Sequence, residues 1–458
     1  MTAQVPPSHS IRQQETKQQH EERMKWWREA RFGMFVHWGL YSALAGNWNN
    51  ERVTKPGTAE WIQNTVQTDT DTYAEQALAK FNPTENFAQQ WAQLAKDAGC
   101  KYVVFTTKHH EGFALHNSEI SDYCAGKKLN RDLVKEITEA LRAQGLRVGF
   151  YHSVIDWHHP QYNYHLSKQI PHPFRDITTD NNDRDHQKYL DYLHAQVKEL
   201  VTNYGHLDVF WYDFSSPDFQ GQEAWRAFDL IQLVDSHQPG IIQNNRLFHC
   251  HEAGWTDSTD LDAVAFNLDT NYGDFISPEQ YVPTDANTVI DWESCMTMNH
   301  TWGYSDYDHN WKQPQEIIHH LIDAASRGGN LLLNVGPKGD GSIPEKSADI
   351  MRGVGAWLKT NGQSIYATIA SPFKNHPWGA ATQKQNTLYL HITNWPADNQ
   401  LNIPITNQII SAKYLASPET PITFTATEQG QTLTLPQQSI DKIATVIELQ
   451  LDAPPNTL

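Results

Sequence analysis

The chain has few cysteines: only four in 458 residues, namely Cys100, Cys124, Cys250 and Cys295. Such widely spaced cysteines are typical of reduced thiols and argue against a disulfide framework. No apolar run reaches the roughly 18 residues that a membrane helix needs, and the Gln-rich N-terminus lacks the apolar segment of a signal peptide. These absences predict a cytoplasmic protein that does not cross a membrane. A secreted protein whose signal peptide had been removed would show the same features.

Positive charge is also scarce, because 35 Lys and Arg face 53 Asp and Glu, for a net charge of −18. An acidic surface repels phosphate backbones and anionic lipids, so we expect no nucleic-acid partner and no membrane-surface partner. Hydrophobic residues make up 39% of the chain, which excludes intrinsic disorder. Aromatic residues are plentiful, with 16 Trp, 18 Tyr and 17 Phe. Such rings suit the faces of sugars, although a large core with Trp at its edges is the plainer explanation of the composition.

Short, apolar, β-prone runs recur along the first three quarters of the chain, and each ends in polar or aromatic residues. They are 32–39, 101–110, 147–157, 206–215, 240–246, 289–294 and 330–337. Helix-like segments separate them, the clearest being 86–99, 131–145, 186–205 and 314–329. Alternating strands and helices favour parallel pairing, so residues 21–362 are predicted to form a (β/α)8-like TIM barrel, an α/β fold. An open doubly wound sheet is the alternative, but no Gly-rich phosphate turn follows the first run.

The pattern differs at the two ends of the chain. After residue 362 only short alternating strands and turn residues follow, which predicts a C-terminal all-β sandwich over 363–458. This sandwich is interpreted as a buttress of the barrel, with a lectin-like module as the alternative. Residues 1–20 are polar and are expected to form a flexible N-terminal arm.

Polar and aromatic residues gather where the apolar runs end. In a TIM barrel the chemistry lies at the carboxyl ends of the strands. There the sequence carries His37-Trp38, His109-His110, Asp156-Trp157, Asp213, Arg246 and Glu293. This gathering is the main evidence, from the residues alone, for an active-site face.

Three carboxylates are candidates for catalysis. Asp213 ends the run HLDVFWYDFS and could attack an electrophilic carbon, as the nucleophile of a retaining glycosidase does, or could simply cap the next loop. Release of an alcohol from a sugar carbon also needs an acid. Glu279, in the loop GDFISPEQYVP, and Glu293, beside Trp292, are both candidates for this role.

We expect neither a metal nor a cofactor. His109 and His110 could bind sugar hydroxyls or a metal, but no HExxH or paired CxxC motif accompanies them. The segment GPKGDG lacks the spacing of a phosphate-binding loop, and no serine-hydrolase elbow occurs.

Several segments together resemble the α-L-fucosidases of glycoside hydrolase family 29. They are RFGMFVHWGLYS, FNPTENFAQQWAQLAKDAGCKYVVFTTKHHEGFALHNS, GFYHSVIDWHHP, DVFWYDF, QNNR, GDFISPEQ, WESCMTMNHTWGY and NLLLNVGPKGDGSIP. The resemblance covers about residues 24–368 closely and the β-rich tail loosely. It implies a (β/α)8-like barrel followed by a β-sandwich, and a metal-free, two-step retaining hydrolysis of terminal α-L-fucosides.

The resemblance also implies roles for individual residues. Asp213 matches the nucleophile of the family, and both Glu279 and Glu293 match positions proposed for the general acid/base. We favour Glu279, because a loop residue could swing over the leaving group, whereas Glu293 looks fixed in the barrel floor. The implied sugar contacts are His37, Glu60, Trp61, His109, His110, Tyr151, Arg246 and Trp302.

The sequence departs from the family pattern in three places. The Glu-Trp pair expected soon after the first strand is matched to Glu60-Trp61, although Asn47-Trp48 lies nearer to that strand. The usual Tyr-Tyr-Ser is Tyr151-His152-Ser153, so His152 is expected to replace a contacting hydroxyl. The small residue that often follows the nucleophile is Phe214, which would narrow the site.

The predicted partner is a fucosylated oligosaccharide or glycoconjugate, and a homo-oligomer is possible. A related α-L-glycosidase such as an α-L-galactosidase is an alternative, because an apolar pocket rejects an added hydroxyl only weakly. A sugar-binding protein that has lost catalysis is a second alternative. The three retained carboxylates argue against it.

Overall fold

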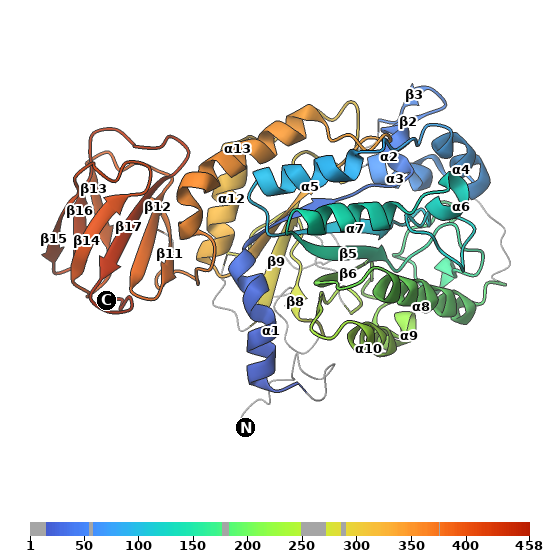
Figure 1. Ribbon diagram of the computed structural model, residues 1–458, viewed down its shortest axis with the longest axis horizontal. Coiled ribbons are helices and arrows are strands. Elements are labelled where there is room, and N and C mark those ends of the chain that lie inside the picture. Colours follow the sequence, from blue (N-terminus) through green and yellow to red (C-terminus); the bar gives the residue numbers. More distant parts are fainter. Residues whose placement is uncertain (1–14, 55–57, 176–182, 249–271, 285–289, 375) are drawn as a thin grey trace.

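The computed structural model describes residues 15–54, 58–175, 183–248, 272–284, 290–374 and 376–458 (Figure 1). Among these residues, eight strands form one parallel sheet in the order β7-β6-β5-β4-β1-β10-β9-β8. The strands are β1 Phe32–Val36, β4 Tyr102–Lys108, β5 Arg147–Ser153, β6 Val209–Asp213, β7 Ile242–Gln243, β8 Phe275–Ile276, β9 Asp291–Met296 and β10 Asn330–Val335. A further parallel bridge joins Asn244, just after β7, to Phe275 of β8. The sheet therefore curls round on itself, and the expected TIM-like barrel is confirmed.

Helices connect most of these strands. Those after β1 are α2 Tyr41–Leu44, α3 Thr58–Val66, α4 Thr70–Leu78 and α5 Phe87–Asp97, with the hairpin β2 Asn47–Trp48 and β3 Glu51–Arg52 between them. The later ones are α6 Ala125–Leu129, α7 Leu133–Ala143, the short η1 Tyr164–Leu166, α8 His186–Asn203, α9 Gly221–Trp225, α10 Ala227–His237, α12 Pro314–Ser326 and α13 Glu345–Asn361. The helices predicted over 86–99, 131–145, 186–205 and 314–329 correspond to α5, α7, α8 and α12. In α7, Ile137 and Leu141 bury the apolar stripe, and the Asp132 side chain accepts the amide N–H of Lys135 to begin the helix.

The strand β8 was absent from the sequence prediction. It has only two residues, Phe275 and Ile276, and both are buried. A pair of apolar residues is too short to show a periodicity, so the pattern along the chain carried no signal for it. β8 matters for function because Ser277 and Glu279 follow it directly.

The helix α1, Lys17–Ala30, lies across the amino-terminal end of the barrel. Its Met24 and Trp27 are fully buried, and the Trp27 ring packs on Phe275 at 4.9 Å between ring centres. The last four residues of the expected arm 1–20 therefore belong to a packed helix, in which His20 is buried. Apolar burial against the barrel floor orders this segment. Residues 1–14 lie outside the described residues.

The C-terminal region forms two antiparallel sheets, as expected. One has the order β11-β12-β17-β14 and the other β13-β16-β15. The strands are β11 Gly379–Lys384, β12 Thr387–Ile392, β13 Gln400–Ile403, β14 Ile409–Tyr414, β15 Thr423–Thr427, β16 Gly430–Thr434 and β17 Thr445–Leu451. The segment SIYATIASPF (364–373), which reads as a short β-prone run, does not form a strand: the edge strand is β11, and only Ile369 of that segment pairs with it. The short helix η2, Gly362–Ser364, occupies its beginning.

The C-terminal sheets pack against the last helices of the barrel (Figure 1). The Trp357 indole in α13 donates to the carbonyl of Ala444 at 3.2 Å, and His319 in α12 lies 2.8 Å from the carbonyl of Ile443. The apolar core of the barrel continues through Tyr389 and Val446 of the sheet. These contacts join the C-terminal sheets to the barrel, while their role as a buttress stays a prediction. Among the described residues, no helix is long and apolar enough to cross a membrane.

Candidate active site

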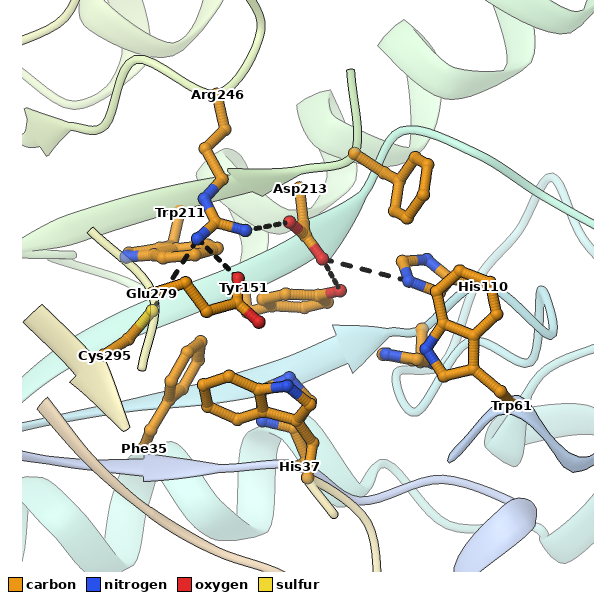
Figure 2. A pocket seen from close by; sticks show the side chains of 13 residues that line it. Phe35, His37, Trp61, His110, Tyr151, Trp211, Asp213, Arg246, Glu279 and Cys295 are labelled. Atoms are coloured by element: carbon orange, nitrogen blue, oxygen red, sulfur yellow. Dashed lines mark hydrogen bonds and ion pairs between the residues drawn. The ribbon is translucent and has the colours of Figure 1, made fainter. Parts of the chain in front are cut away.

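A pocket of about 430 Å³, counting its open mouth, lies at the carboxyl ends of the barrel strands (Figure 2). Its wall combines aromatic rings with a few charged groups, as in many sugar sites. The lining residues are Phe35, His37, Trp61, His109, His110, Tyr151, Trp211, Asp213, Phe214, Arg246, Glu279, Cys295 and Trp302.

Arg246 holds two carboxyl groups in this pocket. Its Nη1 donates to Asp213 Oδ1 at 2.9 Å, and its Nη2 donates to Glu279 Oε2 at 2.7 Å. Asp213 ends β6, whereas Glu279 comes from the segment after β8, so barrel closure brings them together (Figure 2). The guanidinium is itself fixed by two bonds to Ser277 and lies 4.5 Å over the ring of Trp211. The two carboxyls thus share one rigid cation.

The second oxygen of Asp213 faces the opposite side of the pocket. The Tyr151 hydroxyl donates to Asp213 Oδ2 at 2.5 Å, and the Nε2 atom of His110 lies 3.9 Å away. Both oxygens of this carboxylate therefore accept a hydrogen bond, one from Tyr151 in β5 and one from Arg246 in the turn after β7. The residue after it, Phe214, has φ +84°, a strained backbone conformation, and its ring packs on His110 and Trp61.

Burial changes the protonation of the groups around the pocket. It raises the pKa of Glu279, with the charge of Asp213 acting in the same direction, while Arg246 and a hydrogen bond from Trp302 oppose the shift. It lowers the pKa of His37 to about 3 and that of His110 to about 4. It also lowers the pKa of His109 well below its usual range. These histidines are therefore neutral near neutral pH.

Three of the residues expected in the site do not line the pocket. The carboxylate of Glu60 is buried behind it and accepts the amide N–H of Gly303 at 2.9 Å, beside Trp302. The ring of His152 lies 2.9 Å from Thr107 Oγ1 instead. Neighbouring residues of a strand point to opposite sides, and Tyr151 faces the pocket, so His152 faces away.

Glu293 is also outside the pocket. It lies in the barrel interior, where it accepts hydrogen bonds from the Tyr102 hydroxyl and from the Trp211 indole, the latter at 3.4 Å. Burial raises the pKa of Glu293 to about 7. Of the two candidate acids, the structure brings only Glu279 to the pocket with Asp213.

Four residues that line the pocket were not predicted from the sequence as site residues: Phe35, Trp211, Phe214 and Cys295. Phe35 and Trp211 precede His37 and Asp213 by two positions, so the two-residue repeat of a strand could have indicated them. Phe214 was noted only as a bulky residue. No pattern pointed to Cys295, whose Sγ lies 3.7 Å from Arg246 Nη2. Two pairs, Glu60-Trp61 and Asn47-Trp48, were candidates for the Glu-Trp position of the family. Trp61 lines the pocket, whereas Trp48 stacks on Tyr73 elsewhere.

The family model described as alpha-L-fucosidase matches residues 1–363. The chain belongs to the α-L-fucosidase family. A human relative, plasma alpha-L-fucosidase, is 29% identical over 91% of this chain and 87% of its own length.

Solved structures of other family members share the fold. Alpha-L-fucosidase isoenzyme 1 from Paenibacillus thiaminolyticus is 37% identical, with a TM-score of 0.83 over 94% of this chain and 99% of the other. A family 29 α-L-fucosidase from Bacteroides thetaiotaomicron is 28% identical, with a TM-score of 0.81 over 94% and 96%. It was captured as a covalent intermediate, using a Glu-to-Gln variant. The expected family, enzyme class and retaining chemistry are confirmed, and neither the galactosidase nor the silent binding protein is favoured.

Among the described residues, no group of three or more His, Cys, Asp and Glu side chains is arranged to hold a metal ion. Two pocket histidines are instead engaged through Nδ1 with uncharged partners, His37 with Asn334 and His110 with Ser153.

Proposed function

We propose that this α-L-fucosidase removes terminal α-L-fucose from fucosylated oligosaccharides or glycoconjugates, with Asp213 as nucleophile and Glu279 as general acid/base. The observation that carries the proposal is the pair of carboxyls on Arg246. One follows β6 and the other follows β8, and both face one small aromatic pocket. Two carboxyls around a single sugar site are what a double displacement needs.

In the first step, an Asp213 oxygen attacks the anomeric carbon while Glu279 gives its proton to the departing glycosidic oxygen. The carbon–oxygen bond to the aglycone breaks, and a fucosyl ester of Asp213 forms. In the second step, ionised Glu279 takes a proton from water, and the resulting oxygen attacks the same carbon and releases Asp213. Two inversions leave the configuration unchanged.

The surroundings of the two carboxyls suit these different roles. Asp213 accepts hydrogen bonds from Tyr151 and Arg246, which stabilise a negative charge on its oxygens. Glu279 is buried, and the nearby Asp213 charge adds to the effect of burial in favouring its protonated form. After Asp213 becomes a neutral ester, that repulsion disappears, so Glu279 ionises more readily and can act as base in the second step.

We propose that the remaining polar and aromatic groups of the wall bind fucose. His37, His109 and His110 would bond its hydroxyls, and Trp61 and Trp302 would cover its apolar faces. Glu60 would act from behind, by holding the backbone at Gly303 next to Trp302. Tyr151 and Arg246 would steady the nucleophile.

Glu293 is the second candidate for the acid/base. Its hydrogen bonds to Tyr102 and Trp211 favour a positioning role, because Trp211 lies directly under the Arg246 guanidinium. No lining atom of the pocket belongs to Glu293.

The proposal is tested with 4-nitrophenyl α-L-fucoside, 4-nitrophenyl α-L-galactoside and a panel of fucosylated oligosaccharides. We expect release of fucose from non-reducing ends, with proton NMR showing the α-anomer as first product. Hydrolysis of the galactoside at a rate equal to or above that of the fucoside would contradict the substrate assignment, and a first β-anomer would contradict the two-step mechanism.

We also propose a cytoplasmic location, supported by the buried, free thiols of Cys100, Cys124 and Cys295. Fractionation of the source cells tests this, and activity confined to the culture medium would contradict it. A homo-oligomer stays a prediction from the sequence, which light scattering of the purified protein tests.

A further inference from the structure

The hydrogen-bond partners of His37 fix the position of its ring hydrogen. Its Nδ1 lies 2.8 Å from Asn334 Oδ1, and Asn334 Nδ2 donates to the carbonyl of Trp302 at 2.7 Å. A backbone carbonyl can only accept, so the amide nitrogen of Asn334 must face Trp302 and its oxygen must face His37. Because that oxygen also can only accept, Nδ1 of His37 carries the hydrogen.

The same reasoning applies to His110 through a hydroxyl. Its Nδ1 lies 2.7 Å from Ser153 Oγ, and Ser153 donates to the carbonyl of Ile155 at 2.9 Å. A serine has a single hydroxyl hydrogen, which goes to the carbonyl, so Oγ accepts from His110. Nδ1 of His110 therefore carries its ring hydrogen, while Nε2 lies 3.9 Å from Asp213 Oδ2, inside the pocket.

Both rings are neutral near neutral pH, because burial lowers the pKa of His37 to about 3 and that of His110 to about 4. Each Nε2 is then a bare acceptor. The third pocket histidine differs, because Nδ1 of His109 has no hydrogen-bond partner among the described residues. Within the described part of the chain, no partner therefore sets the tautomer of His109 through Nδ1.

We propose that Asn334 and Ser153 are positioning residues, which hold His37 and His110 as Nδ1–H tautomers so that both Nε2 atoms accept hydrogen bonds from the sugar. The proposal rests on the proposed function in so far as the ligand is fucose. It goes further by giving the direction of two hydrogen bonds and the residues that impose it.

This arrangement selects for free hydroxyls. A hydroxyl can donate to a bare Nε2, whereas an ether oxygen or a fluorine cannot. A fucose that carries a substituent on either of the two engaged hydroxyls would leave a buried acceptor without a partner, which is costly. The pocket therefore requires unsubstituted hydroxyls at two positions of the fucosyl unit.

The first test is nitrogen-15 NMR of histidine-labelled enzyme, with the His37→Gln and His110→Gln variants to assign the two signals. We expect a protonated Nδ1 and an unprotonated Nε2 for both rings in the free enzyme. Added L-fucose should shift mainly the Nε2 signals. A protonated Nε2 in either ring would overturn the proposal, even if fucose binds. Correct tautomers with no response to fucose would instead contradict the proposed function.

The second test removes one hydroxyl, in Ser153→Ala, with Thr107→Val as matched control. Thr107 lies on the neighbouring strand, donates to the Tyr151 carbonyl at 2.8 Å and lies 2.9 Å from Nδ1 of His152. Thr107 thus contacts a carbonyl and a histidine Nδ1 as Ser153 does, but its histidine lies outside the pocket. We expect kcat/KM to fall about tenfold in Ser153→Ala, the effect of one hydrogen bond, and to stay within about twofold in the control.

The His110 signal should also show mixed tautomers in Ser153→Ala. Equal losses in both variants would indicate a merely structural role for Ser153. An unchanged tautomer would overturn the proposal for His110, and so the NMR readout decides the case even where a variant is less stable.

The third test is the pH profile of Asn334→Asp. The groups that face His37 are Asp213, Arg246, His109, His110 and Tyr151. A carboxylate placed at Nδ1 would raise the pKa of His37, so the ring would gain a hydrogen on Nε2, and lose its accepting role, at a higher pH than in the wild type. We expect the acid limb of kcat/KM to move up by roughly one pH unit or more.

The matched control for this variant is Asn361→Asp. Asn361 is also buried, and its Nδ2 also donates to a tryptophan carbonyl, that of Trp357, but it lies in α13. The acid limb of kcat/KM should not move in Asn361→Asp. An unmoved acid limb in Asn334→Asp, with the protein folded by circular dichroism, would overturn the role of Asn334.

Discussion

At the scale of single residues, the position of Asp213 makes a sharp prediction. Asp213→Ala should lower kcat by several orders of magnitude, because in the proposed mechanism the fucosyl ester forms on this carboxylate. The fold should survive, because the carboxylate lies at a strand end in the pocket and not in the apolar core. Azide, which can attack the anomeric carbon itself, should restore turnover of an aryl fucoside and yield a fucosyl azide.

The matched control is Asp229→Ala, at an exposed aspartate of α10, which should keep normal activity. Normal turnover in Asp213→Ala would remove this residue from the mechanism. Loss of turnover without azide rescue, in a protein that melts well below the wild type, would indicate a structural aspartate.

The roles of Glu279 and Glu293 can be distinguished by how their variants act on substrates with good and poor leaving groups. A general acid contributes about 10²–10⁴-fold when the departing alcohol is poor and little when it is an activated phenol. Glu279→Gln should therefore lower kcat/KM far more for fucosylated oligosaccharides than for 4-nitrophenyl α-L-fucoside. Glu293→Gln should lower both about equally, because it disturbs Trp211 beneath Arg246 and not the proton transfer. The reverse pattern would exchange the two roles.

At the scale of elements, the site depends on how α1 fills the lower end of the barrel. Trp27→Ala should lower the free energy of unfolding by about 3–5 kcal/mol, because a large ring that packs on Phe275 is lost. Lys25→Ala, an exposed neighbour in the same helix, should change it by less than about 0.5 kcal/mol. Denaturant titration followed by near-ultraviolet circular dichroism measures both. Equal stability of the two variants would show that α1 does not contribute to barrel stability.

The elements also explain which side chains of one strand reach the site. Tyr151 and His152 are neighbours in β5, yet only Tyr151 lines the pocket. The strand repeat of two residues turns His152 toward Thr107 on the outer side. The same repeat places Phe35 with His37, and Trp211 with Asp213, in one wall.

At the scale of the whole molecule, the enzyme is expected to work without a metal. Dialysis against EDTA should leave kcat/KM for an aryl fucoside unchanged. The physical reason is that the proposed nucleophile and acid are both carboxyls on Arg246, and that Asn334 and Ser153 engage two of the pocket histidines. Loss of activity in EDTA that a divalent metal restores would contradict this expectation and revive a metal site at His109 and His110.

Much of the architecture is encoded locally and could be predicted from the sequence. Apolar residues three and four apart in 131–145 specify α7, and the apolar run before Asp213 specifies β6, because each pattern reflects one buried face. Polar residues at the ends of such runs indicated the active-site face, because the chemistry of a TIM barrel lies at the carboxyl ends of its strands. The strand β8 could not be predicted, because two residues are too few to show an alternating pattern. The helical part of the expected arm could not be predicted either, because only its packing on the barrel floor stabilises it.

By itself the sequence determined the strand and helix pattern, the β-rich tail, and the identity of the residues that could do chemistry. Only the tertiary structure decided which of them meet. The sequence left both Glu279 and Glu293 as candidate acids and only favoured Glu279 for its place in a loop. Barrel closure places Glu279 beside Asp213 on Arg246 and leaves Glu293 with Tyr102. The tautomers of His37 and His110 depend likewise on partners far along the chain or across a strand. Such choices rest on contacts between distant segments, and a local pattern cannot specify those contacts.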